Sequence, residues 1–411
     1  MESARPQAVI FAEAPKALTQ VCGVSLLERL LRILRRLDFR QATIVSSTPD
    51  RLRNALEPPT WARRGLEAQI VLPNEINFRK MKRLLILPGD FYYDPRLIGA
   101  LLNSPRSAQL IDSAPPSSIR PLLVDCRSNG SGWLSGAAVL APSELESLAK
   151  GELGALDAAN VPAYVRGMRR HVRPVFFPAP TAERQSLAKR IVFDSAQKGT
   201  LDIPAILQSP VEDWVLHGLC RTTITPNQIT LFGFVVAMGA AALFATGHLW
   251  WGMIPALAIG VIDGLDGKQA RVKVETTPSG HWEHCLDFVF EMSWWSALAW
   301  WFQRSGQLPS AWGYWGLIVG SELVDLLAKL VAHQRLNCAL DDYAPFDRAF
   351  RLIAARRDVY LWTIAVGLLF GAAAQAYAFC AWWGVFRSVV HVVRTLMVVR
   401  PRIVKSRIEN R

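Results

Sequence analysis

The run Asp263-Gly-Leu-Asp266-Gly-Lys-Gln-Ala270-Arg271 lies between two strongly apolar segments, and Gly280, Glu283 and Asp287 follow it. Carboxylates at membrane depth are costly to desolvate, so they are rare there and indicate a function. If both segments are helical, the first two acids are three residues apart and the last two are four apart, so each pair shares one helix face. Four such carboxylates can hold hard divalent cations, with substrate phosphate completing the coordination shell. The alternative is two solvated helix ends that merely carry acids.

This spacing resembles the signature of the CDP-alcohol phosphotransferases: D-x-x-D-G-x-x-A-R, a short gap, then G-x-x-x-D-x-x-x-D. The first half matches at every fixed position. In the second half one residue is missing after Gly280, and the third acid is Glu283 rather than Asp, but the four-residue step to Asp287 is retained. A strict alignment would instead place His284 and Phe288 at the acid positions. We prefer the one-residue deletion, because it falls where a loop can absorb it.

The resemblance implies an integral membrane enzyme of phospholipid biosynthesis. Such an enzyme transfers a substituted phosphate group from a CDP-alcohol to an acceptor alcohol and releases CMP. CDP-diacylglycerol is the expected donor and a phosphorylated polyol the expected acceptor. Members of the family are commonly homodimers. The alternatives are a catalytically inactive binding or structural pseudoenzyme, because the second half of the motif is altered, and a cytidylyltransferase that makes a CDP-alcohol.

The resemblance also assigns roles to the residues of the motif. Mg²⁺ or Mn²⁺ would be held by Asp263, Asp266, Glu283 and Asp287 and would neutralise the pyrophosphate and the departing CMP. Asp287 is the candidate general base, since a carboxylate beside metal ions stays ionised at neutral pH. The CDP group would contact Asp263, Gly267, Ala270 and Arg271. Close helix packing explains the two small residues equally well, and Arg271 could instead be an anchor at the cytoplasmic face.

The acceptor site is predicted from basic residues near the C-terminus. Arg387, His391 and Arg394 are spaced four and three residues apart within an apolar run, so they share a helix face. Basic groups there suggest an anionic ligand such as the phosphate of the acceptor, although Arg394 could instead reach the headgroups. Arg356 and Arg357 are further candidates. A polar stripe of Glu322, Asp325 and Lys329 is expected to form interhelical pairs.

The length and composition divide the chain. Of its 411 residues, we assign 1–190 to a cytosolic nucleotidyltransferase-like domain, 191–225 to a linker with an interfacial helix, and 226–411 to a membrane domain. The N-terminus lacks the basic region of a secretory signal. The net charge of +12 is concentrated beside the apolar segments, which favours anionic lipid headgroups over nucleic acid as the partner. Six scattered cysteines without a CxxC pair support neither a zinc site nor a disulfide framework.

We expect six transmembrane helices in the second half. They are placed at about 226–247, 250–271, 281–303 and 311–333, with two more between 358 and 400 separated near 372–377. Lys and Arg gather on one side of these segments, which predicts a multi-pass protein of the cell inner membrane with both termini cytoplasmic. The preceding stretch 203–219 is either a helix lying in the membrane interface or a packed linker helix. The resemblance favours the interfacial helix.

The first half reads as an α/β domain. Strand, turn, helix and strand follow one another over 8–47, and Leu26, Leu27, Leu30, Leu31 and Leu34 form a helical apolar stripe. A second apolar strand, 84–87, leads to Asp90, and the alternation favours a largely parallel sheet. The pattern resembles a Rossmann-like nucleotidyltransferase domain with Lys16 and Asp90 at substrate and metal positions. Only Glu13 and Ala14 stand where the glycine-rich phosphate loop would be, so we expect a degenerate, non-catalytic domain; retained nucleotide binding is the alternative.

Overall fold

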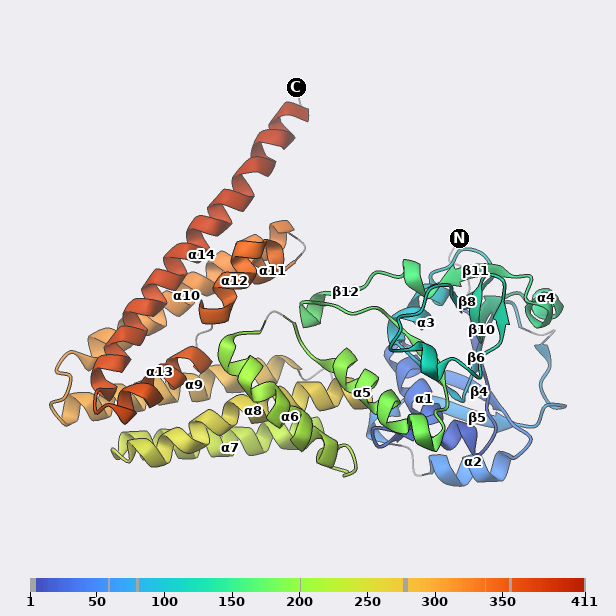
Figure 1. The fold of residues 1–411 in the computed structure, drawn as a ribbon, viewed down its shortest axis with the longest axis horizontal. Coiled ribbons are helices and arrows are strands. Elements are labelled where there is room, and N and C mark those ends of the chain that lie inside the picture. The colour runs from blue at the N-terminus through green and yellow to red at the C-terminus, as the bar shows by residue number, and fades with distance from the viewer. Residues whose placement is uncertain are drawn as a thin grey trace.

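The computed structural model describes residues 5–57, 60–78, 81–199, 201–275, 280–336, 338–354 and 357–409. An α/β domain forms one end of the molecule, and a bundle of long helices extends from it (Figure 1). Helix α5 lies between the two parts, and α6 packs against the bundle beside α8. This arrangement agrees with the predicted combination of an α/β domain and an all-α domain.

The α/β domain is built on a mixed sheet with the strand order β11-β8-β10-β6-β1-β4-β5. Its main strands are β1 (Gln7–Phe11), β4 (Gln41–Val45), β5 (Glu67–Val71), β6 (Leu84–Pro88), β8 (Ala108–Asp112), β10 (Gly132–Leu140) and β11 (Gly154–Asp157). β1 pairs in parallel with both β4 and β6, so that Ile10 lies between Ile44 and Leu87. β4–β5 and β8–β11 are also parallel, whereas β10 is antiparallel to its neighbours β6 and β8. The largely parallel sheet is therefore confirmed.

Shorter elements complete this domain. They are β2 (Gln20–Val21), β3 (Val24–Ser25), β7 (Phe91–Tyr93), β9 (Ser128–Asn129), β12 (Tyr164–Val165), β13 (Arg170–His171), β14 (Phe176–Pro178), α2 (Pro49–Leu56), α3 (Pro95–Leu102) and α4 (Leu145–Lys150). Helix α1 (Leu26–Arg36) begins at Ser25, whose side chain accepts a hydrogen bond from the Glu28 amide. The predicted leucine stripe of α1 is buried. Each such leucine contributes about 1.5–3 kcal/mol of burial free energy, so the stripe fixes α1 to the sheet.

The linker contains α5 (Gln185–Ala196) and α6 (Ile203–Leu219), and α6 has the bounds predicted for the interfacial helix. Gln208 and Glu212 on α6 are buried, whereas Leu207 and Trp214 are 62% and 79% exposed. The buried polar face packs on α8, where a Cβ on Gly260 would lie 2.6 Å from Gln208 Nε2. An apolar face turned outward is unusual for a helix in water and typical of one that lies on a membrane.

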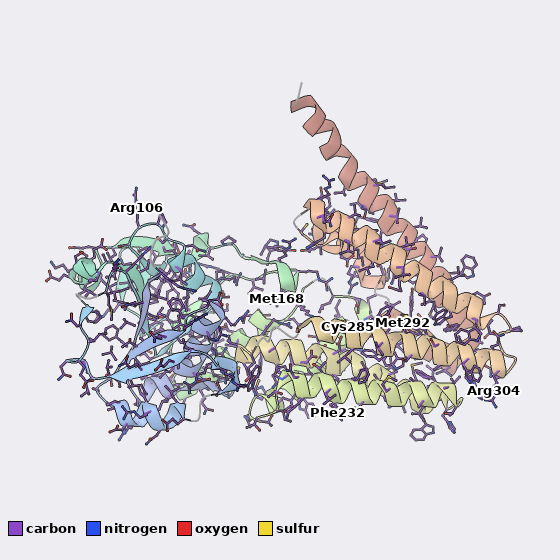
Figure 2. The ribbon with its side chains drawn as sticks, turned by 180° about the vertical axis from the view of Figure 1, so that it is seen from behind. Arg106, Met168, Phe232, Cys285, Met292 and Arg304 are labelled. Atoms are coloured by element: carbon purple, nitrogen blue, oxygen red, sulfur yellow. The ribbon has the colours of Figure 1, made fainter. Side chains whose placement is uncertain are left out.

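The described part of the second half contains six helices at the predicted positions, five of them with at least 20 residues and one with 13 residues. They are α7 (Pro226–Ala245), α8 (Leu249–Lys273), α9 (Gly280–Arg304), α10 (Ala311–Leu336), α13 (Arg357–Leu369) and α14 (Ala373–Glu409), with short helices α11 (Leu340–Tyr343) and α12 (Pro345–Ala354) between α10 and α13. The break before α14 lies slightly earlier than predicted. Among the described residues, three helices are long and apolar enough to cross a membrane: Pro226–Ala245, Leu249–Lys273 and Ala373–Val398. Arg304 lies at the end of α9 farthest from the α/β domain (Figure 2).

Helices α10 and α14 carry their charged residues inside and their apolar residues outside. Glu322, Asp325, Arg387 and His391 are buried between them, while Leu327 of α10 and Phe379, Trp382, Phe386 and Val389 of α14 are exposed. This is the reverse of the pattern in a water-soluble bundle. It fits a bundle with lipid outside and a polar interior.

A single hydrophobic core runs from the α/β domain into the bundle. Its buried members include Leu27 and Leu30 of α1, Leu216 of α6, Ile229 of α7, and Leu265 and Val272 of α8. At the same interface, Arg29 Nη1 of α1 donates to the Val272 carbonyl at 2.6 Å, and Arg32 Nη1 donates to the Lys273 carbonyl at 2.8 Å. The last carbonyls of a helix have no partner within it, and cations are favourable there. The α/β domain therefore caps the C-terminal end of α8.

Candidate active site

A polar cavity of about 420 Å³ lies among α8, α9, α10, α13 and α14. It is lined by Asp263, Asp287 and Glu291 on one side and by basic residues that include Arg357, Arg387 and Lys329. The cavity thus brings two acids of the predicted metal site together with two residues of the predicted acceptor site.

A smaller space of about 20 Å³ is lined by three of the four predicted acids, Asp263, Asp266 and Asp287. Asp263 and Asp266 project from α8, and Asp287 projects from α9. Thr230 of α7 also lines this space. Two helices therefore place the described carboxylates of the motif around one space, and the three-residue spacing puts Asp263 and Asp266 on the same side of α8.

Asp263 and Asp266 are hydrogen-bonded to side chains of neighbouring helices. Asp263 Oδ2 accepts a hydrogen bond from Arg357 Nη2 at 2.6 Å, and Asp266 Oδ2 accepts one from Thr230 Oγ1 at 2.6 Å. Asp266 is only 3% exposed, so the hydroxyl of Thr230 compensates part of its desolvation. Sequence reasoning placed Thr230 at the start of the first span, together with Thr225 and Pro226, but assigned it no role in the site.

The carboxylate oxygens around this space are the donor type that Mg²⁺ and Mn²⁺ prefer. The side chain of Glu283, the remaining predicted ligand, lies outside the described residues. Among the described side chains, no group of three potential ligands is close enough to hold one ion. Asp263 is hydrogen-bonded to Arg357, so the donors fit a divalent cation in chemistry but are not assembled around one.

The residues predicted to contact CDP lie along α8. Asp263, Gly267 and Ala270 are separated by four and three residues, so they share one face of the helix. Arg271 Nε donates to the Ala196 carbonyl at 2.7 Å, and this guanidinium therefore caps the end of α5. A Cβ on Gly267 would lie 3.0 Å from Arg271 Nη1, so Arg271 partly covers the backbone there.

Lys268, which was not predicted as a site residue, connects three helices. Its ammonium group is buried and donates to Gln197, just beyond α5, and to Asp213 of α6. Its position inside the motif was visible in the sequence, but its partners are 71 and 55 residues away along the chain. Lys268 holds the juxtamembrane helices against the helix that carries the acids.

Some of the predicted acceptor residues line the cavity, and others attach α14 to neighbouring helices. Arg387 donates to Glu322 at 2.6 Å, His391 pairs with Asp325, and Arg394 forms two 2.8 Å hydrogen bonds with Asp347 of α12. Arg387 and Arg357 therefore line the cavity, whereas His391 and Arg394 hold α14 to its neighbours. Arg356 lies outside the described residues. The interhelical pairs expected of Glu322, Asp325 and Lys329 are confirmed: the first two pair with α14, and Lys329 pairs with Asp341 of α11 at 3.4 Å.

The corresponding region of the α/β domain is occupied by protein atoms. Glu13 follows β1, and its carboxylate accepts hydrogen bonds from the Ser47 amide at 2.8 Å and the Ser47 hydroxyl at 2.6 Å. A carboxylate therefore occupies the end of β1 and β4, where the resemblance would place a phosphate-binding loop. Burial raises the pKa of Asp90, and the nearby Lys16 offsets only part of that increase.

Comparisons with known proteins agree with the motif. Residues 223–399 match the family model of the CDP-alcohol phosphatidyltransferases. A phosphatidylinositol phosphate synthase from Mycobacteroides abscessus is 29% identical over 117 residues, which are 28% of this chain and 50% of that protein. A bifunctional IPC transferase and DIPP synthase from Rubrobacter xylanophilus is 31% identical over 159 residues, which are 38% of this chain and 34% of that protein. The chain thus spans half or less of the length of these curated relatives.

Solved structures similar to part of the chain include HddC from Yersinia pseudotuberculosis, with a TM-score of 0.30 and 13% identity over 45% of this chain and 98% of that one. Another is the inositol-1-phosphate CTP transferase from T. maritima, with a TM-score of 0.32 and 11% identity over 46% of this chain and 98% of that one. The family match concerns the helical half. Residues 223–399 of this chain form a domain of the CDP-alcohol phosphatidyltransferase family of enzymes.

Proposed function

We propose that this protein transfers a substituted phosphate group from a CDP-alcohol to an acceptor alcohol and releases CMP. The observation that carries the proposal is the placement of Asp263, Asp266 and Asp287 around one space beside a polar cavity. The family match and the names of the relatives support it. CDP-diacylglycerol is the donor that we propose, because the exposed apolar helices around the cavity would keep a lipid donor within reach.

The reaction requires attack by the acceptor oxygen on phosphorus and departure of CMP. We propose that Asp287 accepts the proton of the acceptor hydroxyl as the new P–O bond forms and the P–O bond to CMP breaks. Mg²⁺ or Mn²⁺, held by Asp263, Asp266, Glu283 and Asp287, would supply neutralisation of the phosphate charges. Thr230 orients the buried Asp266 through the hydrogen bond described above. Gly267, Ala270 and Arg271 are proposed to contact the CDP group.

The acceptor that we propose is a phosphorylated polyol. Arg387 and Arg357 line the cavity, and their guanidinium groups suit a phosphate group. A relative named for phosphatidylinositol phosphate synthesis is consistent with such an acceptor. We further propose a homodimer in the inner membrane with six spans and both termini in the cytoplasm, since Lys and Arg gather at the end of the bundle next to the α/β domain.

CMP release from CDP-diacylglycerol by the purified full chain tests this proposal. We expect release with Mg²⁺ or Mn²⁺, its loss on chelation, and its loss in Asp266→Ala when the protein remains folded. Asp194→Ala, which removes an exposed carboxylate from α5, is the matched control and should retain activity. Equal activity in the Asp266→Ala variant would contradict the proposed site. Incorporation of label from CTP into a CDP-alcohol would instead support a cytidylyltransferase, and absence of both reactions would support a pseudoenzyme.

For the α/β domain we propose a non-catalytic role as a brace for α8. Glu13 would repel phosphate at the end of β1, which argues against nucleotide transfer there. Arg29 and Arg32 are 2% and 5% exposed and bond to the last carbonyls of the helix that carries Asp263 and Asp266. Arg32 also pairs with Glu275 at 2.8 Å. Buried arginines in this position restrict the movement of the end of α8, and through it the position of the acids.

A further inference from the structure

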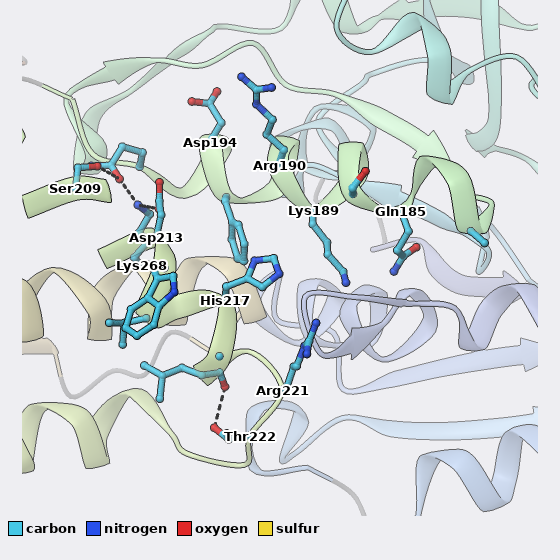
Figure 3. A pocket seen from close by; sticks show the side chains of 18 residues that line it. Gln185, Lys189, Arg190, Asp194, Ser209, Asp213, His217, Arg221, Thr222 and Lys268 are labelled. Atoms are coloured by element: carbon cyan, nitrogen blue, oxygen red, sulfur yellow. Dashed lines mark hydrogen bonds and ion pairs between the residues drawn. The ribbon is translucent and has the colours of Figure 1, made fainter. Parts of the chain in front are cut away.

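A groove of about 1250 Å³ separates α5 from α6 on the surface next to the α/β domain (Figure 3). It is distinct from the polar cavity, with which it shares no lining residue. The groove contains both cationic and aromatic side chains. Its composition therefore suggests a ligand with an anionic part and an apolar part.

Three basic side chains from two sides of the groove point into the same space. Figure 3 shows Lys189 of α5 facing His217 of α6 and Arg221, which follows α6. No hydrogen bond or ion pair with another described residue engages the charged end of Lys189 or Arg221. The ring of His217 packs edge-on against Phe193 with the centroids 5.6 Å apart. Two cations and an imidazole thus surround one space without a protein anion between them.

The acids that line the groove already have cationic partners. Asp213 is paired with Lys268, and Asp194 is paired with Arg170 at 2.9 Å. These carboxylates are therefore less able to neutralise Lys189 and Arg221. An anion bound in the space among the three basic groups would gain charge-assisted hydrogen bonds from Lys189 and Arg221.

The apolar part of the groove continues onto the outer face of α6. Trp214 lines the groove and is 79% exposed. Ile203, Leu207 and Val211 are also exposed and precede Trp214 at spacings of four, four and three residues, so the four side chains form one stripe. A tryptophan between an apolar stripe and a basic pocket is typical of the headgroup level of a membrane.

We propose that this groove binds the phosphate headgroup of an anionic phospholipid, with the acyl chains lying along the apolar stripe of α6. The basic groups recognise the phosphate and the stripe distinguishes a lipid from a soluble phosphate compound. Such a lipid would connect α5 and α6, the two helices that Lys268 attaches to α8. The proposal does not depend on the transferase reaction.

Native mass spectrometry of the full chain in detergent tests the proposal with phosphatidylglycerol and phosphatidylcholine of equal chain length. We expect preferential retention of phosphatidylglycerol by the wild type. In the double variant Lys189→Gln/Arg221→Gln the preference should fall by about tenfold or more, which is the change expected for loss of a charge-assisted hydrogen bond. Arg190→Gln is the matched control, because Arg190 is the next residue of α5 and points away from that space (Figure 3).

Two further measurements separate the possible outcomes. Trp214→Ser should weaken retention of phosphatidylglycerol. Inorganic phosphate and CDP, added to the wild type as soluble competitors, should displace little of the bound lipid. Thermal unfolding and CMP release should stay unchanged in all three variants, so that the result is independent of folding and of the active site. Equal preference in the double variant and the wild type, an equal loss in Arg190→Gln, or displacement of the lipid by millimolar phosphate would overturn the proposal.

Discussion

The end of β1 and the part of α8 that carries Asp263 and Asp266 are two regions where the sequence resembles an enzyme site, and the groups that the structure places there differ. At β1, the carboxylate of Glu13 is bonded to Ser47 and occupies the position of a phosphate loop. At α8, Asp263 and Asp287 border a cavity of about 420 Å³. The order of strands and helices is therefore a weaker guide to activity than the chemistry of the few residues at the site.

The physical surroundings of the two regions also differ. The acids of α8 and α9 lie in a bundle whose apolar residues face outward, so retaining them has a desolvation cost that a function can explain. Glu13 is exposed at the surface of the α/β domain, where a carboxylate costs little and need not have a function. We therefore expect substitutions in the two regions to affect different properties.

The largest effect is expected for Asp287→Asn. The amide cannot accept the proton of the acceptor hydroxyl, so CMP release should fall by about 10²–10⁴-fold while the protein remains folded. Steady-state CMP release and thermal unfolding of the full chain measure the two properties. A residual activity within a few-fold of wild type would exclude Asp287 as the general base.

Arg32→Ala is expected to destabilise the connection between the two regions. It leaves Glu275 without one buried partner and removes a cap from α8, and loss of one partner of a buried ion pair costs about 3–5 kcal/mol. Hydrogen exchange followed by mass spectrometry should report faster exchange near the end of α8. Arg32→Lys should restore part of the protection because it keeps the charge.

Arg35→Ala is the matched control for that experiment. Arg35 is on the same helix but bonds to the Arg64 carbonyl, within the α/β domain and exposed to solvent. Its removal should cost no more than about 1 kcal/mol. If both variants increased exchange in α8 equally, the brace that we propose would be wrong.

The helices and their faces could be predicted from the sequence, because periodicity is a local property. The leucine stripe of α1, the bounds of α6 and the positions of the six main helices of the bundle follow from it. The contacts that complete the site are not local. Thr230 and Asp266 are 36 residues apart, and Arg29 and Val272 are 243 apart. The partners of Arg387, His391 and Arg394 likewise depend on how α10, α12 and α14 pack, which no pattern within one helix specifies.

Arg387→Lys is expected to have an intermediate effect. Lysine keeps the charge next to Glu322 but lacks the planar fork that binds phosphate, so the KM for a phosphorylated acceptor should rise by about tenfold with a smaller change in kcat. Arg394→Lys is the control, because Arg394 is bonded to Asp347 and does not line the cavity. Its main effect should be a lower melting temperature. A similar KM increase in both variants would mean that Arg387 has no specific role in acceptor binding.

The smallest effect is expected for Asp90→Asn, which tests the inactive region. Burial raises the pKa of Asp90 above its ordinary value of 3.8, so the folded protein binds this proton more tightly than the unfolded chain does. Asp90 therefore lowers stability as the pH rises above that ordinary value, and the penalty is complete once the pH exceeds the folded pKa. Asn removes the penalty, so the variant should melt a few degrees higher at neutral pH and lose this advantage below about pH 4. CMP release should be unchanged, since Asp90 follows β6 in the α/β domain and the acids of α8 and α9 lie in the bundle. A large loss of activity in Asp90→Asn would instead mean that the α/β domain takes part in the chemistry, and the contrast between the two regions would no longer hold.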